Sequence, residues 1–277
     1  RNAFISIAQD MNAVLIRSAY TPVIYEGKDC VVALLDEKGE VLGQSSGLPL
    51  FLGNLQVCVQ ETARIYGWDY FKEGDIFFVN DSFFTGTHLN DITIFAPIFW
   101  NKQLAGFSAS RAHWLDVGAK DPGGSMDSSN IYQEGFRWPV TRLYENNEPK
   151  KEIIEFLRMN GRFGYSLIGD MNAQIAAGKT GEKRFKGILD RFGLDLVRSA
   201  RNEIFKQSEE LEKIAVKKIK NGSYDSEGFL DDDGLGSDPV KIKMKVTVED
   251  EKITIDLDGS AKQTQGPVNC GFAQTIS

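Results

Sequence analysis

Two mainly apolar runs in the first half of the chain are separated by a short polar link. The runs cover residues 92–100 and 104–112, and Asn101-Lys102-Gln103 lies between them. Apolar runs around so short a link predict a β-hairpin. A turn centred on Asn101-Lys102 sets Asn90 opposite His113, and directly opposed residues have Cβ atoms about 5 Å apart. The open end of the hairpin is therefore predicted to bring the residues around position 90 next to His113.

The rest of the pattern mixes helical and strand periods. Apolar residues at Phe4, Ala8, Met11 and Leu15 have helical spacing and predict a helix over residues 1–18. Further predictions are helices over 54–66, 152–160, 169–177, 180–192 and 194–219, a strand over 76–80, and hairpins joining 30–35 to 40–42 and 240–248 to 252–257. This mixture predicts an α+β fold, in which β-hairpins and a sheet pack against helices. We expect three regions, an α+β region over 1–149, a helical region over 150–220 and a β-hairpin region over 221–277.

Charge and cysteine content limit the classes of partner. The net charge of the 277 residues is −7, and acidic and basic residues are interspersed. That argues against a surface for nucleic acid or for an anionic membrane. No apolar run reaches the roughly 20 residues of a membrane span. Cys30, Cys58 and Cys270 lie far apart without a CxxC pair, which fits a reduced, cytoplasmic protein.

The candidate chemistry gathers at the open end of the central hairpin. The chain has two histidines, His88 and His113, and both fall at this end. Asp91 follows His88 by three residues, at the start of the first strand. Two imidazoles and one carboxylate on neighbouring loop ends suit a divalent metal ion. Each residue taken alone has a structural alternative, a hydrogen-bonded histidine or a turn-forming aspartate, but their convergence favours a ligand role.

Several long segments resemble one protein family. NDSFFTGTHLNDITIFAPIF, RAHWLDVGAKDPGGSM, IYQEGFRWPV and later GDMNAQIAAGKTGEKRF and DLDGSAKQTQGPVN resemble the hydantoinase B family. This family includes the large non-ATPase subunits of N-methylhydantoinases and of acetone or acetophenone carboxylases, and the C-terminal half of 5-oxoprolinases. The resemblance covers essentially all 277 residues. Family members are about twice this long, so we expect the polypeptide to continue into a further C-terminal part.

The resemblance implies a metal site formed by four residues. His88, Asp91 and His113 would be ligands, with Glu26 from TPVIYEGKDC as the fourth, although spacing alone gives no reason to bring Glu26 there. Asp116 lies close after His113 in the chain and is our candidate for the base or for a hydrogen-bond partner of the ligands. Nitrogen and oxygen ligands without cysteine do not choose among zinc, manganese and iron.

Three further residues are candidates for substrate contact. Gly123 and Gly124 lie in a glycine-rich turn, which either approaches a ligand closely or is an ordinary turn. Phe51 stands where many family members have a histidine, and it predicts an apolar or aromatic portion of substrate. The alternative is that Phe51 only packs under the 49–53 segment. Glu134 is a weaker candidate for an acid near the ligands, since a surface role suits it equally.

The nucleotide is expected elsewhere. The glycine-rich turn lacks the Lys-Ser/Thr pair of a Walker A loop, and the resemblance implies that ATP binds a separate hydantoinase A-like ATPase subunit in a hetero-oligomer. Our chain would be the metal-containing subunit of an ATP-dependent cyclic-amide hydrolase for hydantoins, oxoproline or lactams. The alternatives are a subunit of an ATP-dependent ketone carboxylase and a metal-free scaffold for the ATPase. The sequence does not name the small-molecule substrate.

Overall fold

The computed structural model describes residues 1–277, apart from the side chains of Pro49 and Leu52. The chain forms two compact units. The first unit contains Arg1–Ser125, Tyr132–Val197 and Cys270–Ser277, and the second contains Met126–Ile131 and Arg198–Asn269. These units cut across the three predicted regions, because the helices up to Val197 and the last eight residues join the first unit.

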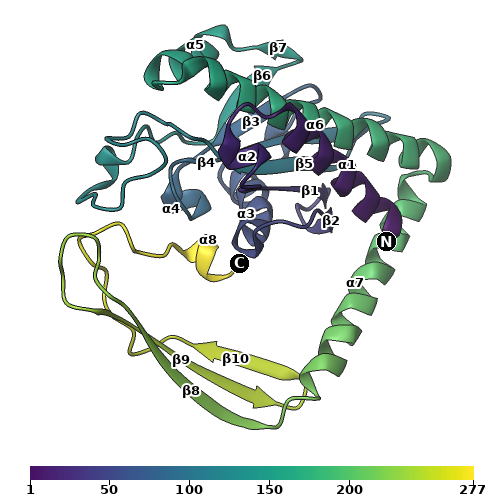
Figure 1. The fold of residues 1–277 in the computed structure, drawn as a ribbon. Helices are drawn as coiled ribbons and strands as arrows, with labels where there is room; N and C mark the ends of the chain where they lie inside the picture. Colours follow the sequence, from purple (N-terminus) through teal and green to yellow (C-terminus); the bar gives the residue numbers. More distant parts are fainter. The chain divides into compact units, whose positions relative to one another are not determined.

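Figure 1 traces the elements along the chain. In chain order, the first unit contains α1 (Asn2–Ser18), α2 (Pro22–Tyr25), β1 (Cys30–Asp36), β2 (Val41–Gln44), α3 (Pro49–Tyr66), η1 (Trp68–Tyr70), β3 (Ile76–Val79), α4 (Ser82–Thr85), β4 (Asp91–Trp100), β5 (Gln103–His113), β6 (Thr141–Glu145), β7 (Glu148–Pro149), α5 (Lys151–Asn160), α6 (Gly164–Phe192) and α8 (Phe272–Thr275). The second unit contains β8 (Gly222–Leu230), β9 (Val240–Glu249) and β10 (Lys252–Asp256). Two elements, η2 (Ile131–Gln133) and α7 (Leu194–Val216), cross the boundary between the units.

The first unit is built on a seven-stranded sheet. Its strand order is β2-β1-β5-β4-β3-β6-β7, and each pair of neighbours is antiparallel. The β4–β5 hairpin therefore lies in the interior of the sheet, with β1 on one side and β3 on the other. The predicted α+β class, with hairpins and packed helices, is confirmed.

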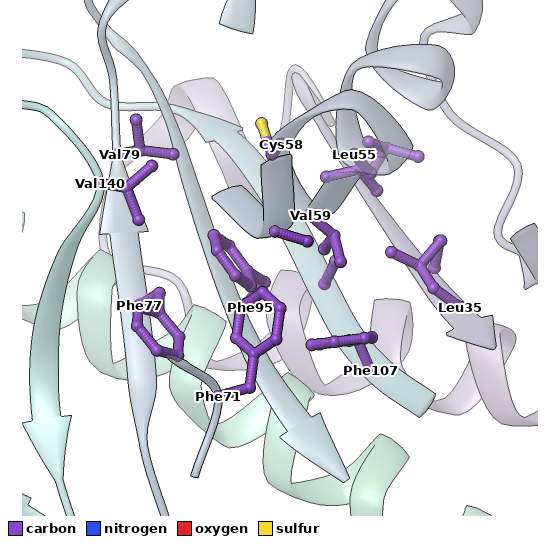
Figure 2. Close-up of a cluster of buried hydrophobic side chains, with 14 of the residues drawn as sticks. Leu35, Leu55, Cys58, Val59, Phe71, Phe77, Val79, Phe95, Phe107 and Val140 are labelled. Atoms are coloured by element: carbon purple, nitrogen blue, oxygen red, sulfur yellow. The ribbon is translucent and has the colours of Figure 1, made fainter. Parts of the chain in front are cut away.

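One face of this sheet packs against α3. Successive residues of a strand point to opposite faces, and alternate residues of β1 and β5 join Leu55 and Val59 of α3 in a single apolar cluster. Figure 2 shows four phenylalanines of this cluster, Phe71, Phe77, Phe95 and Phe107, next to α3. Phe77 and Phe95 stack with ring centroids 5.2 Å apart. This core anchors the strands that carry the candidate residues.

The opposite face packs against α1 and α6. Phe4 of α1 and Phe185 of α6 meet edge to face with ring centroids 5.9 Å apart. Gln174 of α6 accepts a hydrogen bond from Trp114 Nε1 at 2.8 Å and donates one to the Ile92 carbonyl at 3.1 Å. The helix is thus tied to both strands of the central hairpin. It is one continuous helix, whereas the sequence predicted two, because Gly178 and Gly181 stay helical within this packing.

The register of the central hairpin differs from the prediction by one residue. The turn lies at Asn101-Lys102, where both residues have positive φ (49° and 64°), as two-residue hairpin turns of type I′ require. A β-bulge between Ile98 and Phe99 then shifts the pairing. Asp91, not Asn90, is therefore the residue directly opposite His113.

The second unit contains an antiparallel sheet of order β10-β9-β8. The predicted β9–β10 hairpin is confirmed. The strand β8 was missed, because polar residues fill most of SYDSEG. In the first unit β6 and β7 were missed as well, and α3 begins at Pro49 rather than at Asn54. Across the part of the chain that the structure describes, no helix is both long enough and apolar enough to cross a membrane.

Candidate functional site

Asp91 and His113 form a buried pair at the open end of the β4–β5 hairpin. Asp91 Oδ1 lies 2.9 Å from His113 Nδ1, and Asp91 is fully buried. Burial raises the pKa of Asp91, but the hydrogen bond to His113 and the charges of Arg111 and His113 outweigh it and lower this pKa to about 2. An ionised carboxylate only accepts hydrogen bonds. His113 Nδ1 is therefore the donor, and in the neutral ring Nε2 keeps its lone pair.

Asp29 is the second carboxylate beside His113. Its Oδ2 lies 4.0 Å from His113 Nδ1, and its backbone carbonyl accepts a hydrogen bond from His113 N at 3.0 Å. Asp29 Oδ1 is buried without a hydrogen-bond partner among the described residues. Burial raises the pKa of Asp29, the positive charges of His113 and His88 lower it, and Asp91 raises it, with a net increase. Burial lowers the pKa of His113, but the bond to Asp91 and the charges of Asp91 and Asp29 raise it overall.

His88 faces this pair from the loop between α4 and β4. Its ring stands edge-on to the ring of His113, with centroids 5.9 Å apart. Its backbone N–H donates to Asp91 Oδ2 at 2.9 Å, while its side chain is exposed. Glu134 lies near enough for the charge of His88 to lower its pKa, although burial raises this pKa overall. Imidazoles and carboxylates from four separate segments thus converge.

Arg111 carries a buried positive charge beneath this group. Its side chain is fully buried, with its guanidinium carbon 5.5 Å from the centre of the Phe51 ring. Burial lowers the pKa of Arg111, and the negative charge of Asp91 raises it. Arg111 and Asp91 therefore compensate one another electrostatically in the interior.

Among the convergent side chains, Asp91 and His113 are joined by a hydrogen bond. Among the residues that the structure describes, no three histidine, cysteine, aspartate or glutamate side chains lie in an arrangement that would hold a metal ion. Both oxygens of Asp91 are engaged, one by His113 and the other by the His88 backbone. The hydrogen bond to Asp91 orients the ring of His113, whereas the ring of His88 is exposed.

Comparisons with known proteins identify the family. The family model described as hydantoinase B/oxoprolinase matches residues 1–277. The chain belongs to this family. A relative from Pseudomonas sp. (strain NS671), provisionally named as the B component of a D-/L-hydantoinase, is 33% identical over 281 residues, covering 98% of this chain and 48% of the relative. The chain thus spans about half the length of the curated relatives that it matches.

Two solved structures have the same fold. The crystal structure of the ATP-dependent caprolactamase from Pseudomonas jessenii matches with a TM-score of 0.90 and 25% identity, over 100% of this chain and 48% of that one. Acetone carboxylase in its nucleotide-free structure matches with a TM-score of 0.87 and 19% identity, over 95% of this chain and 37% of that one. At 19% identity, the second match shows the fold alone.

The structure separates Glu26 from Asp29, the two acids at the end of the same short segment. Glu26 is exposed at the C-terminal end of α2. Among the residues described, the charged groups that shift the pKa values of Asp29, Asp91 and His113 belong to these three residues themselves, to His88 and to Arg111. Glu26 is not one of these groups. The metal-ligand role that the family resemblance implies for Glu26 stays a prediction. It is Asp29 that lies beside His113. The reason is local, because Asp29 directly precedes β1, which pairs with β5.

Asp116 is engaged in a structural network. Its Oδ1 accepts hydrogen bonds from Arg162 Nη1 at 2.9 Å and from Gly118 N at 3.0 Å. Its Oδ2 accepts one from the backbone N–H of Arg162. Arg162 also donates to the carbonyl of Ala119. Asp116 therefore joins the loop after β5 to the start of α6, and the contacts described give no support to its predicted role as a base.

The three predicted substrate residues have different surroundings. Phe51 is 3% exposed and belongs to the core against α3, which is the packing alternative that the sequence left open. Gly123 and Gly124 have positive φ of 84° and 103° and open space where a Cβ would stand. The backbone of Gly123 hydrogen-bonds His113 and raises its pKa. The glycine turn therefore lies beside the histidine, and its contact with substrate stays a prediction.

Sequence reasoning missed Asp29 and Arg111 as members of the site. Arg111 did carry a signal, since it is the one charged residue in the apolar run 104–112. A charge within a buried strand needs compensation, and the carboxylate of Asp91 lies two residue positions beyond Thr93, the residue that pairs with Arg111 in the hairpin. Asp29 gave no comparable signal, because it stands in a charged segment with Glu26 and Lys28.

Proposed function

We propose that this chain forms part of the hydrolytic subunit of an ATP-dependent cyclic amidase. The observation that carries the proposal is the convergence of His88, Asp91, His113 and Asp29 in a chain of the hydantoinase B/oxoprolinase family. The relatives and the solved caprolactamase take their names from reactions at cyclic amides. The substrate class we propose is therefore a hydantoin, 5-oxoproline or a lactam.

The donor set suits a divalent metal ion, although its present arrangement is not that of a metal site. Two imidazoles and two carboxylates are ligands that zinc, manganese and iron all accept. The unpartnered, buried Asp29 Oδ1 supports the fit, because a buried carboxylate oxygen without a hydrogen bond needs a donor or a cation. We propose His88, Asp91, His113 and Asp29 as the holding residues. A bound metal would lower the pKa of a water molecule and polarise the amide carbonyl.

The protein's own groups orient this centre. Asp91 is ionised and holds His113 through Nδ1, which leaves Nε2 as the nitrogen available for a ligand. The Gly123 backbone lies beside the same ring and raises the pKa of His113. Glu134 is our candidate for the carboxyl group that transfers a proton, since burial raises its pKa and it lies near His88. Substrate contact by Gly123, Gly124 and Phe51, and a base role for Asp116, stay predictions.

Activation of the amide belongs to a partner in this proposal. Relatives named as subunits support a hetero-oligomer, and an ATPase subunit of the hydantoinase A type would phosphorylate the amide oxygen. A cytoplasmic location stays a prediction. It is supported by the three cysteines, which are free thiols.

The test is ATP turnover by the complex of this protein with its ATPase subunit. Hydantoin, 5-oxoproline and caprolactam should each be offered with and without bicarbonate. We expect at least one cyclic amide to stimulate phosphate release without bicarbonate, and Asp91→Asn to abolish ring opening. Gln207→Ala, an exposed change on α7, is the matched control and should leave turnover unchanged. A strict bicarbonate requirement with a ketone substrate would overturn the proposal in favour of carboxylation, for which the fold similarity at 19% identity is the available support.

A further inference from the structure

Thr87, directly before His88, has an unusual backbone conformation. Its φ is +63°, and Gly86 before it has φ +69°. Glycine adopts this left-handed region freely, but a β-branched residue does so only under strain. Such a conformation persists where the surrounding structure holds it in place, and it is frequent at functional sites. The groups that hold Thr87 are therefore informative.

Arg111 holds the loop from inside the core. Its Nη2 donates to the Gly86 carbonyl at 2.7 Å and also to the hydroxyl of Thr87. The same guanidinium contacts Thr85 Oγ1 at 3.3 Å and Thr93 Oγ1 at 3.2 Å. Because Arg111 is fully buried on β5, these bonds tie the loop to the rigid centre of the sheet.

Gln274 holds the loop from the other end of the chain. Its side-chain oxygen accepts a hydrogen bond from the backbone N–H of Thr87 at 3.2 Å, across 187 residues of sequence. Ser277 fixes the same segment by donating to Asn54 of α3 at 3.0 Å. A Cβ on Gly86 would stand 2.9 Å from the backbone nitrogen of Gln274, so the glycine is needed for this close approach.

Thr87 thus connects these two anchors to the candidate centre. Its hydroxyl hydrogen-bonds Asp91, and the next residue, His88, donates its backbone N–H to Asp91 Oδ2. We propose that Thr87 is a positioning residue: Arg111 and Gln274 hold it in the left-handed conformation, and this conformation sets the place of His88 relative to Asp91 and His113. The inference rests on the proposed role of His88 in that centre.

The test is NMR spectroscopy of the two histidine side chains of the chain. Protein labelled with ¹⁵N-histidine gives two sets of imidazole signals, which His88→Gln assigns. Gln274→Met removes the acceptor for Thr87 N–H at similar volume, and Gln274→Glu keeps an acceptor. Thr87→Gly removes the strain and the hydroxyl. Gln207→Met, on exposed α7, is the matched control.

We expect Gln274→Met and Thr87→Gly to shift or broaden the His88 signals in metal-free protein. Gln274→Glu and Gln207→Met should keep them as they are, and His113 should keep its Nδ1 signal in Gln274→Met. Zn²⁺ titration should show roughly three- to tenfold weaker binding in Gln274→Met, because this variant loses one hydrogen bond.

A merely structural role for this loop would lower resistance to urea while the His88 signals and the Zn²⁺ affinity stay unchanged. Unchanged His88 signals in both Gln274→Met and Thr87→Gly would overturn the inference. Failure of the unaltered protein to bind Zn²⁺ would instead count against the proposed metal centre. The imidazole signals of the metal-free protein decide the positioning role in either case.

Discussion

The guanidinium of Arg111 lies fully buried between the central hairpin and α3, and five neighbouring residues depend on it for hydrogen bonds or charge balance. Removing one partner of a buried charge network leaves the other without compensation. Arg111→Met should therefore lower the free energy of unfolding by about 3 kcal/mol. Urea unfolding at neutral pH measures this. Arg64→Met, at an exposed pair with Glu61, should change the free energy by less than about 0.5 kcal/mol. Equal effects of the two changes would contradict the account.

Asp233 gives a prediction about pH that is independent of the candidate site. Backbone N–H groups of Leu235 and Gly266 bond its carboxylate and lower its pKa below the ordinary 3.8. A lowered pKa in the folded state stabilises the protein above the unfolded value, and that contribution is lost as pH falls through the folded value. Asp233→Asn should therefore lower the urea midpoint at pH 7, and its difference from the parent protein should shrink below about pH 4. The exposed Asp258→Asn is the control. A difference that is constant with pH would contradict the assignment.

At the scale of residues, the chemistry of the site was predictable only in part. The hairpin pattern predicted that His88, Asp91 and His113 come together, and they do, because a strong local signal fixed which strand ends meet. Their role as metal ligands stays a prediction. Asp29 was not predicted, since it stands in one charged segment with Glu26. Its place depends on the pairing of β1 with β5, which brings Asp29 to the backbone of His113.

At the scale of elements, one irregular position decides the geometry of the central hairpin. The apolar runs and the turn at Asn101-Lys102 were predicted correctly. The bulge at Ile98 and Phe99 has no clear sequence signal, and it moves every pair beyond it by one residue. Side chains alternate between faces, so this shift brings Asp91 and His113 onto the same face of the sheet.

The glycines of α6 allow a matched test of how this helix packs. Gly187 is exposed and has open space around its missing Cβ. Gly187→Ala should raise the free energy of unfolding by about 0.5–1 kcal/mol, since alanine favours the helix. Gly181 lies against α1, where an added Cβ would stand 2.5 Å from the sulfur of the buried Met11. Gly181→Ala should lower stability by about 1–3 kcal/mol. Chemical unfolding of both variants measures these changes in the free energy of unfolding. A stabilising Gly181→Ala would show that α1 and α6 do not meet as described.

At the scale of the whole molecule, the chain is divided by contacts and not by position in the sequence. A boundary at residue 150 was expected from the change to helical composition. The structure assigns α5 and α6 to the first unit, because α6 covers the sheet face opposite α3. The segment after Cys270 also belongs to the first unit. Long-range docking of this kind leaves little trace in local patterns.

The account also predicts that the chain alone does not turn over ATP, since it assigns nucleotide binding to a partner. Phosphate release by highly purified chain, with and without a cyclic amide, is the measurement. Turnover that survives removal of every other protein would contradict the division of labour between subunits.

The central claim is that His88, Asp91, His113 and Asp29 hold a divalent metal ion, and elemental analysis of the purified protein tests it most directly. The parent protein and the exposed control Gln207→Ala should each contain about one zinc, manganese or iron per chain. His113→Ala and the double change His88→Ala/His113→Ala should lose it, while circular dichroism shows that they remain folded. Stoichiometric metal in the double variant, or none in the parent after exposure to each of the three ions, would contradict the claim.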